Sequence, residues 1–224
     1  MPKKSTKKAA VKAPVTAYIL LDRSGSMDIR MQEAIGSINA YAKELAKSGT
    51  AADITLCTFD DVHGMQFEVV RRRVTAKEWK PVEVAEVSPR GGTPLYDAID
   101  RIVMAAEIEG ADRTVIAIMT DGYENASKSI TREKAKQILD KARAKDWEVI
   151  FMGADFDAMA QSASVGNQVS KTINISVGNY QNTMRGFAGS TAAYATGQAI
   201  NFTDADRAVA GGTKVSGSNA RGGI

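Results

Sequence analysis

Short runs of apolar residues recur along the chain and predict the strands of a buried sheet. Four runs have the length of a strand, and three of them are apolar on both faces. Strands of that kind are typical of a parallel sheet covered by helices on its two sides. The four runs are residues 18–21, 54–57, 115–119 and 149–152.

Apolar residues spaced three or four positions apart predict helices between these strands. Residues 31–45 form the first such segment, and Gly49 follows it as a stop signal. Residues 95–106 and 135–142 repeat the pattern ahead of the third and fourth runs. The alternation predicts an α/β fold with an open, mostly parallel central sheet covered by helices.

The segment after the second run breaks this alternation. Residues 66–73 predict a strand behind a tight His63-Gly64 turn, and we expect it to pair antiparallel at the edge of the sheet. Arg71-Arg72-Arg73 would suit an exposed edge strand.

The pattern weakens toward the C-terminus, where small residues dominate. We expect a short helix at residues 156–163 and a short strand at residues 171–176. A further weak helix is expected at residues 180–198, interrupted by three glycines. These glycines are Gly186, Gly189 and Gly197.

Charge divides the chain into a core and two tails. Residues 1–12 contain five lysines and no acidic residue; removing these from the 29 basic residues leaves 24, against 26 acidic ones. We therefore expect residues 1–14 to be a flexible basic tail, residues 15–200 one domain, and residues 201–224 a flexible tail rich in glycine and serine. The basic tail could contact nucleic acid or an acidic partner, but a solvated extension is favoured.

Residue counts exclude several classes of protein. The 224 residues, 44% hydrophobic and 25% charged, are typical of a globular protein, and no apolar run approaches the roughly 18 residues of a membrane span. The apolar run behind the first lysines ends at Asp22, too early for a secretory signal, so we expect a cytoplasmic protein.

Cys57 is the only cysteine and is expected to be buried; His63 is the only histidine. An intramolecular disulfide, a zinc ribbon and a multi-histidine metal cage are therefore excluded, and a Ser-His-Asp hydrolase would have to use His63.

Oxygen-bearing side chains follow the first and third predicted core strands. Asp22-Arg23-Ser24-Gly25-Ser26 ends the first, and Thr120-Asp121-Gly122 ends the third. Gly91-Gly92-Thr93-Pro94 opens the helix that leads into the third strand. In a right-handed open sheet all three segments lie at the carboxyl edge of the strands. If the first strand neighbours the third, the crevice between them is the switch point where ligands bind.

These side chains would select a hard divalent cation. Asp22 and Asp121 supply two negative charges, and Ser24, Ser26 and Thr93 supply neutral oxygens, with no sulfur or imidazole nearby. That set favours Mg²⁺ or Mn²⁺, and two adjacent carboxylates would repel each other without a cation. Because Mg²⁺ takes about six oxygens and keeps waters readily, a position stays open for an acidic side chain of another molecule.

The same residues resemble the metal-ion-dependent adhesion site of von Willebrand factor A domains, also called integrin I-like domains. The family pattern is DxSxS, a later Thr and a later Asp, and all five positions match, at Asp22, Ser24, Ser26, Thr93 and Asp121. The resemblance covers about residues 15–200 and implies a doubly wound sheet. It implies that the two serines bind the metal directly and that the other three bind it directly or through water. It also implies that a Glu or Asp of a partner completes the coordination.

Extracellular adhesion members of this family usually carry a signal peptide and often disulfides, and we expect neither in this chain. In that respect the chain looks more like the small intracellular members of the family in bacteria and their viruses. Some of those members work beside AAA+ ATPases or in stress-resistance assemblies. The resemblance therefore implies a partner protein of that kind.

Other interpretations remain for these residues. Asp22, Ser24 and Ser26 could simply form a turn and cap a helix, Thr93 could cap the helix that begins at Pro94, and Asp121 could belong to an Asp-Gly turn. Five compatible oxygens at one sheet edge favour metal binding over these separate roles. Three other acidic residues near this edge are expected to be loop and capping residues. They are Asp28, Asp60 and Asp61.

Two other functions compete with metal-dependent protein binding. A Mg²⁺-dependent phosphatase of the haloacid-dehalogenase type has the pattern DxDxT after its first strand. In this chain Ser24 stands where the second carboxylate of that pattern would be. The phosphate-binding patterns GxxxxGK[ST] and GxGxxG are absent, and no general base is evident beside the metal, so we expect no enzyme. The chain could also be an assembly component that acts through its tails.

Overall fold

The computed structural model describes residues 14–153 and 158–211 of the chain. Six strands form one sheet in the order β3-β2-β1-β4-β5-β6, and only the β2–β3 pair is antiparallel within it. This confirms the predicted mostly parallel sheet with one antiparallel edge strand. The strands are β1 (Val15–Asp22), β2 (Ala52–Asp61), β3 (Met65–Thr75), β4 (Thr114–Thr120), β5 (Glu148–Gly153) and β6 (Thr172–Asn174).

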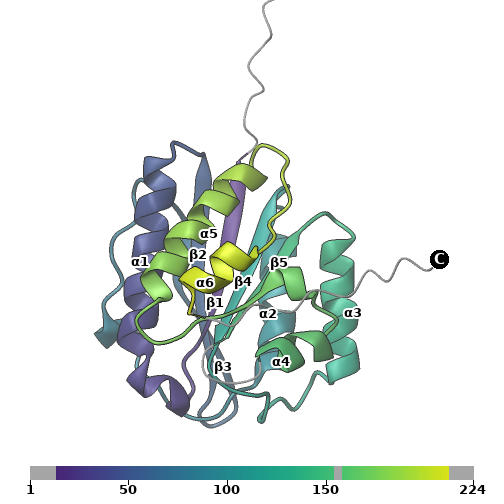
Figure 1. Cartoon of the computed structure of the whole chain (residues 1–224). Coiled ribbons are helices and arrows are strands. Elements are labelled where there is room, and N and C mark those ends of the chain that lie inside the picture. The colour runs from purple at the N-terminus through teal and green to yellow at the C-terminus, as the bar shows by residue number, and fades with distance from the viewer. Residues whose placement is uncertain (1–13, 154–157, 212–224) are drawn as a thin grey trace, which may run out of the picture.

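Helices cover both faces of the sheet. In Figure 1, α1, α5 and α6 lie in front of it, and α2 and α3 lie behind. The helices are α1 (Met31–Lys47), α2 (Leu95–Ile108), α3 (Arg132–Arg143), α4 (Ala158–Ser164), α5 (Tyr180–Tyr194) and α6 (Asp204–Val209). None of these described helices is long and apolar enough to cross a membrane.

The two-sided apolar pattern of the strands follows from this layering. Ile19 and Leu21 of β1 pack in the layer of α1 and α5, whereas Tyr18 and Leu20 pack in the layer of α2 and α3. Successive side chains of a strand point to opposite faces, so a strand covered on both sides is apolar throughout.

Cys57 lies on the second of these faces and is fully buried. Burial raises the pKa of its thiol to about 12. Because the thiolate is the reactive form, we expect the thiol of the native protein not to react with DTNB. In denaturant, each chain should release one equivalent of thionitrobenzoate from DTNB. Reaction of the native protein within minutes would contradict this burial.

The edge strand β3 carries its arginines as predicted, but they are paired rather than merely solvated. Arg71 pairs with Glu86, Arg72 with Glu109 and Arg73 with Asp53.

The structure differs from the sequence prediction in the C-terminal third. Helix α5 runs unbroken through Gly186 and Gly189, so the expected interruption is wrong there. Its packing on α1 explains the difference, because the rings of Tyr41 and Phe187 stack with centroids 5.2 Å apart. Tertiary contacts of this kind override the roughly 1 kcal/mol penalty of a helical glycine. The expected helix at 156–163 begins within residues 154–157, which lie outside the described part of the chain; α4 follows them.

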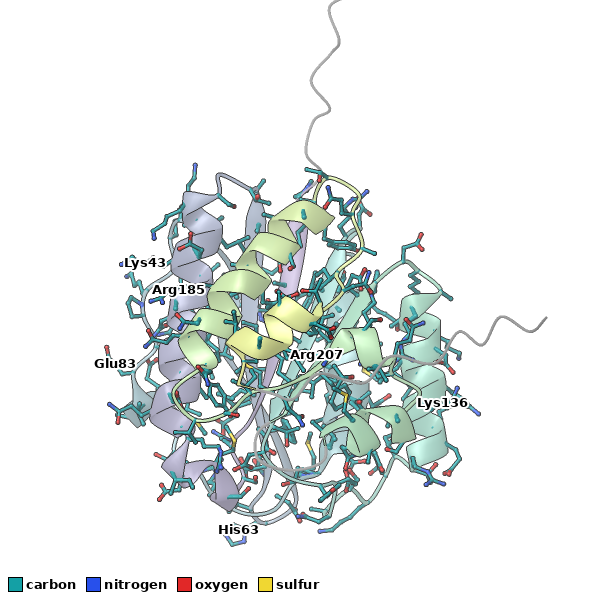
Figure 2. All side chains as sticks on the ribbon, viewed as in Figure 1. Lys43, His63, Glu83, Lys136, Arg185 and Arg207 are labelled. Carbon is teal, nitrogen blue, oxygen red and sulfur yellow. The ribbon has the colours of Figure 1, made fainter. Side chains whose placement is uncertain are left out.

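Residues 201–211 belong to the folded domain rather than to a tail. Helix α6 begins with a capping box between Thr203 and Asp206. The buried Arg207, labelled in Figure 2, donates to the carbonyl oxygens of Thr172 and Val169 at 2.8 and 2.7 Å. Phe202 is buried beside the helix. Residues 212–224, like residues 1–13, lie outside the described part.

Candidate metal centre

The residues predicted from the sequence to hold a metal lie where β1 and β4 end side by side. The two strands are parallel neighbours, and Leu21 is paired with Met119. Asp22 and Asp121 therefore leave the sheet at the same edge. This arrangement meets the condition for a ligand-binding switch point between the first and third core strands.

Hydrogen bonds connect the side chains of this edge. Ser26 Oγ donates to Asp121 Oδ1 at 2.6 Å, and the hydroxyl oxygens of Ser24 and Ser26 are 3.1 Å apart. The Ser24 N–H donates to Asp22 Oδ1 at 2.7 Å. A Cβ atom placed on Gly122 would lie 3.7 Å from both Ser26 Oγ and Thr93 Oγ1. The structure thus brings all five predicted residues together.

Asp22 is fully buried at the centre of this group. Burial raises the pKa of its carboxyl to about 6; hydrogen bonds from Thr120 and Ser24 oppose the rise, and the negative charge of Asp121 adds to it. The hydroxyl of Thr120 donates to Asp22 Oδ2 at 2.6 Å. A cation bound beside this carboxylate would favour its ionised form, since opposite charge offsets desolvation.

Thr93 does not cap the helix that follows it. Helix α2 begins at Leu95 and its N-cap is Pro94, so the capping interpretation is wrong. The first N–H groups of the helix donate instead to side chains of a later loop, that of Tyr96 to Glu124 Oε2 and that of Asp97 to Ser127 Oγ. Asn125 holds the Thr93 backbone instead: Asn125 Oδ1 accepts from the Thr93 N–H at 2.8 Å, and the Asn125 N–H donates to the Thr93 carbonyl at 3.1 Å. Thr93 is buried, and its hydroxyl lies near Gly122, as does that of Ser26.

Two glycines allow this loop to reach its place. Gly91 has a φ of +67°, and a Cβ atom there would lie 2.7 Å from the Asp61 carbonyl oxygen. At Gly92 a Cβ atom would lie 2.9 Å from Asn125 Oδ1. The Gly91 carbonyl accepts from the Gly25 N–H at 3.0 Å, which ties the loop to the DxSxS segment. Larger residues would push Thr93 away from the other ligands.

The remaining acidic residues near this edge have different roles. Asp28 is exposed, and Asp61 lies 3.7 Å from Lys128. Asp60 does accept from the Val62 N–H, as a turn residue would. It is also fully buried and paired with Arg23 at 2.5 Å, which the loop interpretation did not anticipate.

Sequence reasoning missed three residues of the site. Thr120 supports Asp22, Asn125 supports Thr93, and Arg30 places Nη1 3.6 Å from Asp121 Oδ2. The position of Thr120 next to Asp121 at a strand end was an available signal. Asn125 and Arg30 reach the site only through the folding of their loops.

The donor set fits a hard divalent cation. It consists of two carboxylates and three hydroxyls, and no group of three or more His, Cys, Asp or Glu side chains suited to a metal occurs in the described part of the chain. A cation bound here would need the hydroxyl oxygens as well as the two carboxylates, and oxygen donors of this kind suit Mg²⁺ or Mn²⁺. His63 is exposed and projects outward from the lower edge of the molecule in Figure 2.

No protein-family model matches the sequence, and no curated protein is detectably similar to it. Solved structures do resemble the fold. The vWF domain of the type V pili tip protein Mfa5 from Porphyromonas gingivalis has a TM-score of 0.64 at 14% identity, over 87% of this chain and 100% of that one. The manganese-loaded TRAP protein of Plasmodium vivax has a TM-score of 0.52 at 15% identity, over 76% of this chain and 72% of that one.

A von Willebrand factor type A protein from Catenulispora acidiphila has a TM-score of 0.56 at 14% identity, over 80% of this chain and 43% of that one. At these identities the likeness concerns the fold. It agrees with the strand order and the helical layers described above. The chain therefore has the fold of von Willebrand factor type A domains.

Proposed function

We propose that the chain is a divalent-metal-dependent protein-interaction module with an intact metal-ion-dependent adhesion site. The convergence of Asp22, Ser24, Ser26, Thr93 and Asp121 at one sheet edge carries the proposal. Mg²⁺ or Mn²⁺ would be held by the two serines directly and by the other three directly or through water. The open position would accept an Asp or Glu of a partner protein.

The site is proposed to bind rather than to catalyse. A haloacid-dehalogenase-type phosphatase would need a second carboxylate at position 24, where the Ser24 hydroxyl lies 3.1 Å from that of Ser26. His63, the only imidazole of the chain, is exposed at the tip of the β2–β3 turn. Metal-dependent phosphatase activity of the purified protein would support the enzymatic alternative.

The partner is proposed to be a protein. The solved neighbours include a pilus tip protein and a pilus adhesin from Lactobacillus rhamnosus, which supports an interaction role. For this chain we propose a cytoplasmic setting in a bacterium or phage, with an AAA+ ATPase or an assembly component as partner. The single cysteine, a free and buried thiol, supports a reducing setting of that kind. We propose no contact with a membrane. Contact with nucleic acid is proposed only through the basic N-terminal tail.

Partner capture in the presence and absence of metal tests this function. Protein immobilised with Mg²⁺ is expected to retain its partner, and excess EDTA to release it, because the partner's carboxylate would bind through the metal. Asp121→Ala should lose the partner, whereas Asp28→Ala, which changes an exposed acid two residues after Ser26, should retain it.

Deletion of residues 1–12 separates this function from the tail-based alternative. The truncated protein is expected to keep its EDTA-sensitive partner. A complex that persists in EDTA but disappears on truncation would show that the tail makes the contact.

A further inference from the structure

A groove of about 650 Å³ lies between α1 and the segment that follows β3. Side chains of α1 form one wall of this groove, and side chains of residues 76–81 form the other. Small residues such as Ala40 and Ala46 leave the space open, and the half-buried Trp79 gives it an aromatic wall. The groove is therefore largely apolar.

Hydrogen bonds hold the two walls together. Asn39 Oδ1 accepts from the indole N–H of Trp79 at 3.0 Å and from the Val82 N–H at 2.9 Å. Asn39 Nδ2 donates to the Val82 carbonyl at 3.0 Å. One side chain of α1 thus fixes the ring of Trp79 and the backbone behind it. A ligand would not have to order this wall, which lowers the free-energy cost of binding.

The rim of the groove is positively charged. Lys43 and Lys77 line it and are exposed. Their side chains form no ion pair or hydrogen bond within the described part of the chain. Lys47 lines the groove as well, and none of the lining residues is acidic. The groove therefore combines apolar surface with positive charge that no lining residue neutralises.

The acidic residues nearest in sequence are engaged elsewhere. Glu44 accepts from Lys47 at 3.0 Å, in a pair whose side chains are 39% and 59% exposed and which is therefore weak. Glu78 accepts from the Thr75 hydroxyl at 2.7 Å. Neither acid pairs with the two exposed lysines of the rim.

This combination fits a segment of a partner protein that carries acidic and apolar residues together. Its apolar side chains would enter the groove, and its carboxylates would meet the lysines of the rim. A membrane surface is a poorer occupant because the apolar walls are recessed behind the charged rim. The N-terminal residues 1–12 are also a poorer occupant, because their five lysines would be repelled by the same rim.

We propose that the groove between α1 and residues 76–81 is a docking site for an acidic segment of a partner protein that also carries apolar side chains. The groove is separate from the proposed metal site, because Lys43 and Lys47 lie toward the C-terminal end of α1 and the metal site adjoins its beginning. In Figure 2, Lys43 lies on the left, well above His63 at the lower edge. Binding in the groove should therefore need no metal.

Selection from a library of displayed random peptides tests this proposal with the full chain. The selection is carried out in EDTA, so that no peptide is retained through a metal ion. We expect the enriched peptides to combine Asp or Glu with Leu, Ile or Phe. Labelled copies of these peptides should bind the double variant Lys43→Glu, Lys77→Glu at least about ten-fold more weakly than the wild type, as measured by fluorescence anisotropy.

Two further variants separate the groove from a general effect of charge. The double variant Lys134→Glu, Lys141→Glu reverses two exposed lysines of α3, which covers the other face of the sheet, and changes the net charge equally. It should bind within about two-fold of the wild type. Ala40→Leu keeps every charge but fills the groove, so it should weaken binding about ten-fold or more.

Three results would overturn the proposal. One is that no peptide is enriched; another is that both charge-reversed variants lose binding equally. The third is unchanged binding by Ala40→Leu, provided that circular dichroism shows it folded; if it is not folded, the comparison of the two charge-reversed variants decides. Binding to phosphatidylserine vesicles that is lost in Lys43→Glu, Lys77→Glu, without any enriched peptide, would assign the rim to a membrane instead. Because EDTA is present throughout, these outcomes do not depend on the proposed metal-binding function.

Discussion

Mg²⁺ or Mn²⁺ is expected to raise the thermal unfolding midpoint of the wild-type protein by about 5–10 °C over its value in EDTA, and Asp121→Ala to abolish the rise. A ligand bound only by the folded state adds about 2.7 kcal/mol at a concentration one hundred times its dissociation constant. For a domain of 150–250 residues, each kcal/mol moves the midpoint by roughly 2–4 °C. Differential scanning fluorimetry across a metal series measures the effect.

Asp121 is the suitable position for this test because its side chain is at the site and outside the apolar core. One of its oxygens accepts from Ser26, and the other faces Arg30. Asp28→Ala serves as the control, since it removes an exposed carboxylate two residues after Ser26 and should retain the full rise. A midpoint that does not respond to metal in the wild type would contradict metal binding by the chain alone.

The alternation of strands and helices was predictable because both layers of the core leave an imprint on the sequence. Strand β1 is apolar at successive positions since Leu20 and Leu21 enter different layers. The convergence of the candidate ligands at one sheet edge was predictable for a related reason. Asp22 and Asp121 directly follow buried runs, and the ends of neighbouring parallel strands lie together.

What the sequence did not reveal depends on contacts between distant segments. Helix α5 tolerates Gly186 and Gly189 because α1 packs along it, and α6 is held by contacts from Arg207 to Thr172 and Val169. The local sequence pattern gives only the helix propensity of these segments, and that propensity is weak. It does not show which other parts of the fold pack against them.

The charged residues around the site escaped prediction in the same way. Arg23 occupies the first variable position of the DxSxS pattern, so the pattern predicts no role for it. In the structure it is buried and reaches Asp60 of β2, and its backbone N–H donates to the Phe59 carbonyl at 3.0 Å. Nothing local in the sequence distinguishes such a pair from two solvated loop residues.

Asp60→Ala is expected to be the most destabilising of the variants considered, by about 3–5 kcal/mol, because it leaves a buried guanidinium without its main partner. The Arg23 side chain is 4% exposed and Asp60 fully buried. Asp60 also accepts from Arg90 at 3.3 Å and from the Val62 N–H at 3.0 Å. The expected loss corresponds to roughly 6–20 °C in the unfolding midpoint, measured in EDTA so that metal binding does not contribute.

Glu68→Ala provides the matched control, since Glu68 pairs with the same Arg23 but its side chain is 51% exposed. An exposed partner of this kind contributes at most about 1 kcal/mol. A similar loss in both variants would contradict the assignment of Asp60 as the main partner. Because Arg23 lies between the proposed ligands Asp22 and Ser24, the pair also holds their loop against β2. Asp60→Ala should therefore reduce the metal-induced rise in the midpoint as well, whereas Glu68→Ala should leave that rise intact.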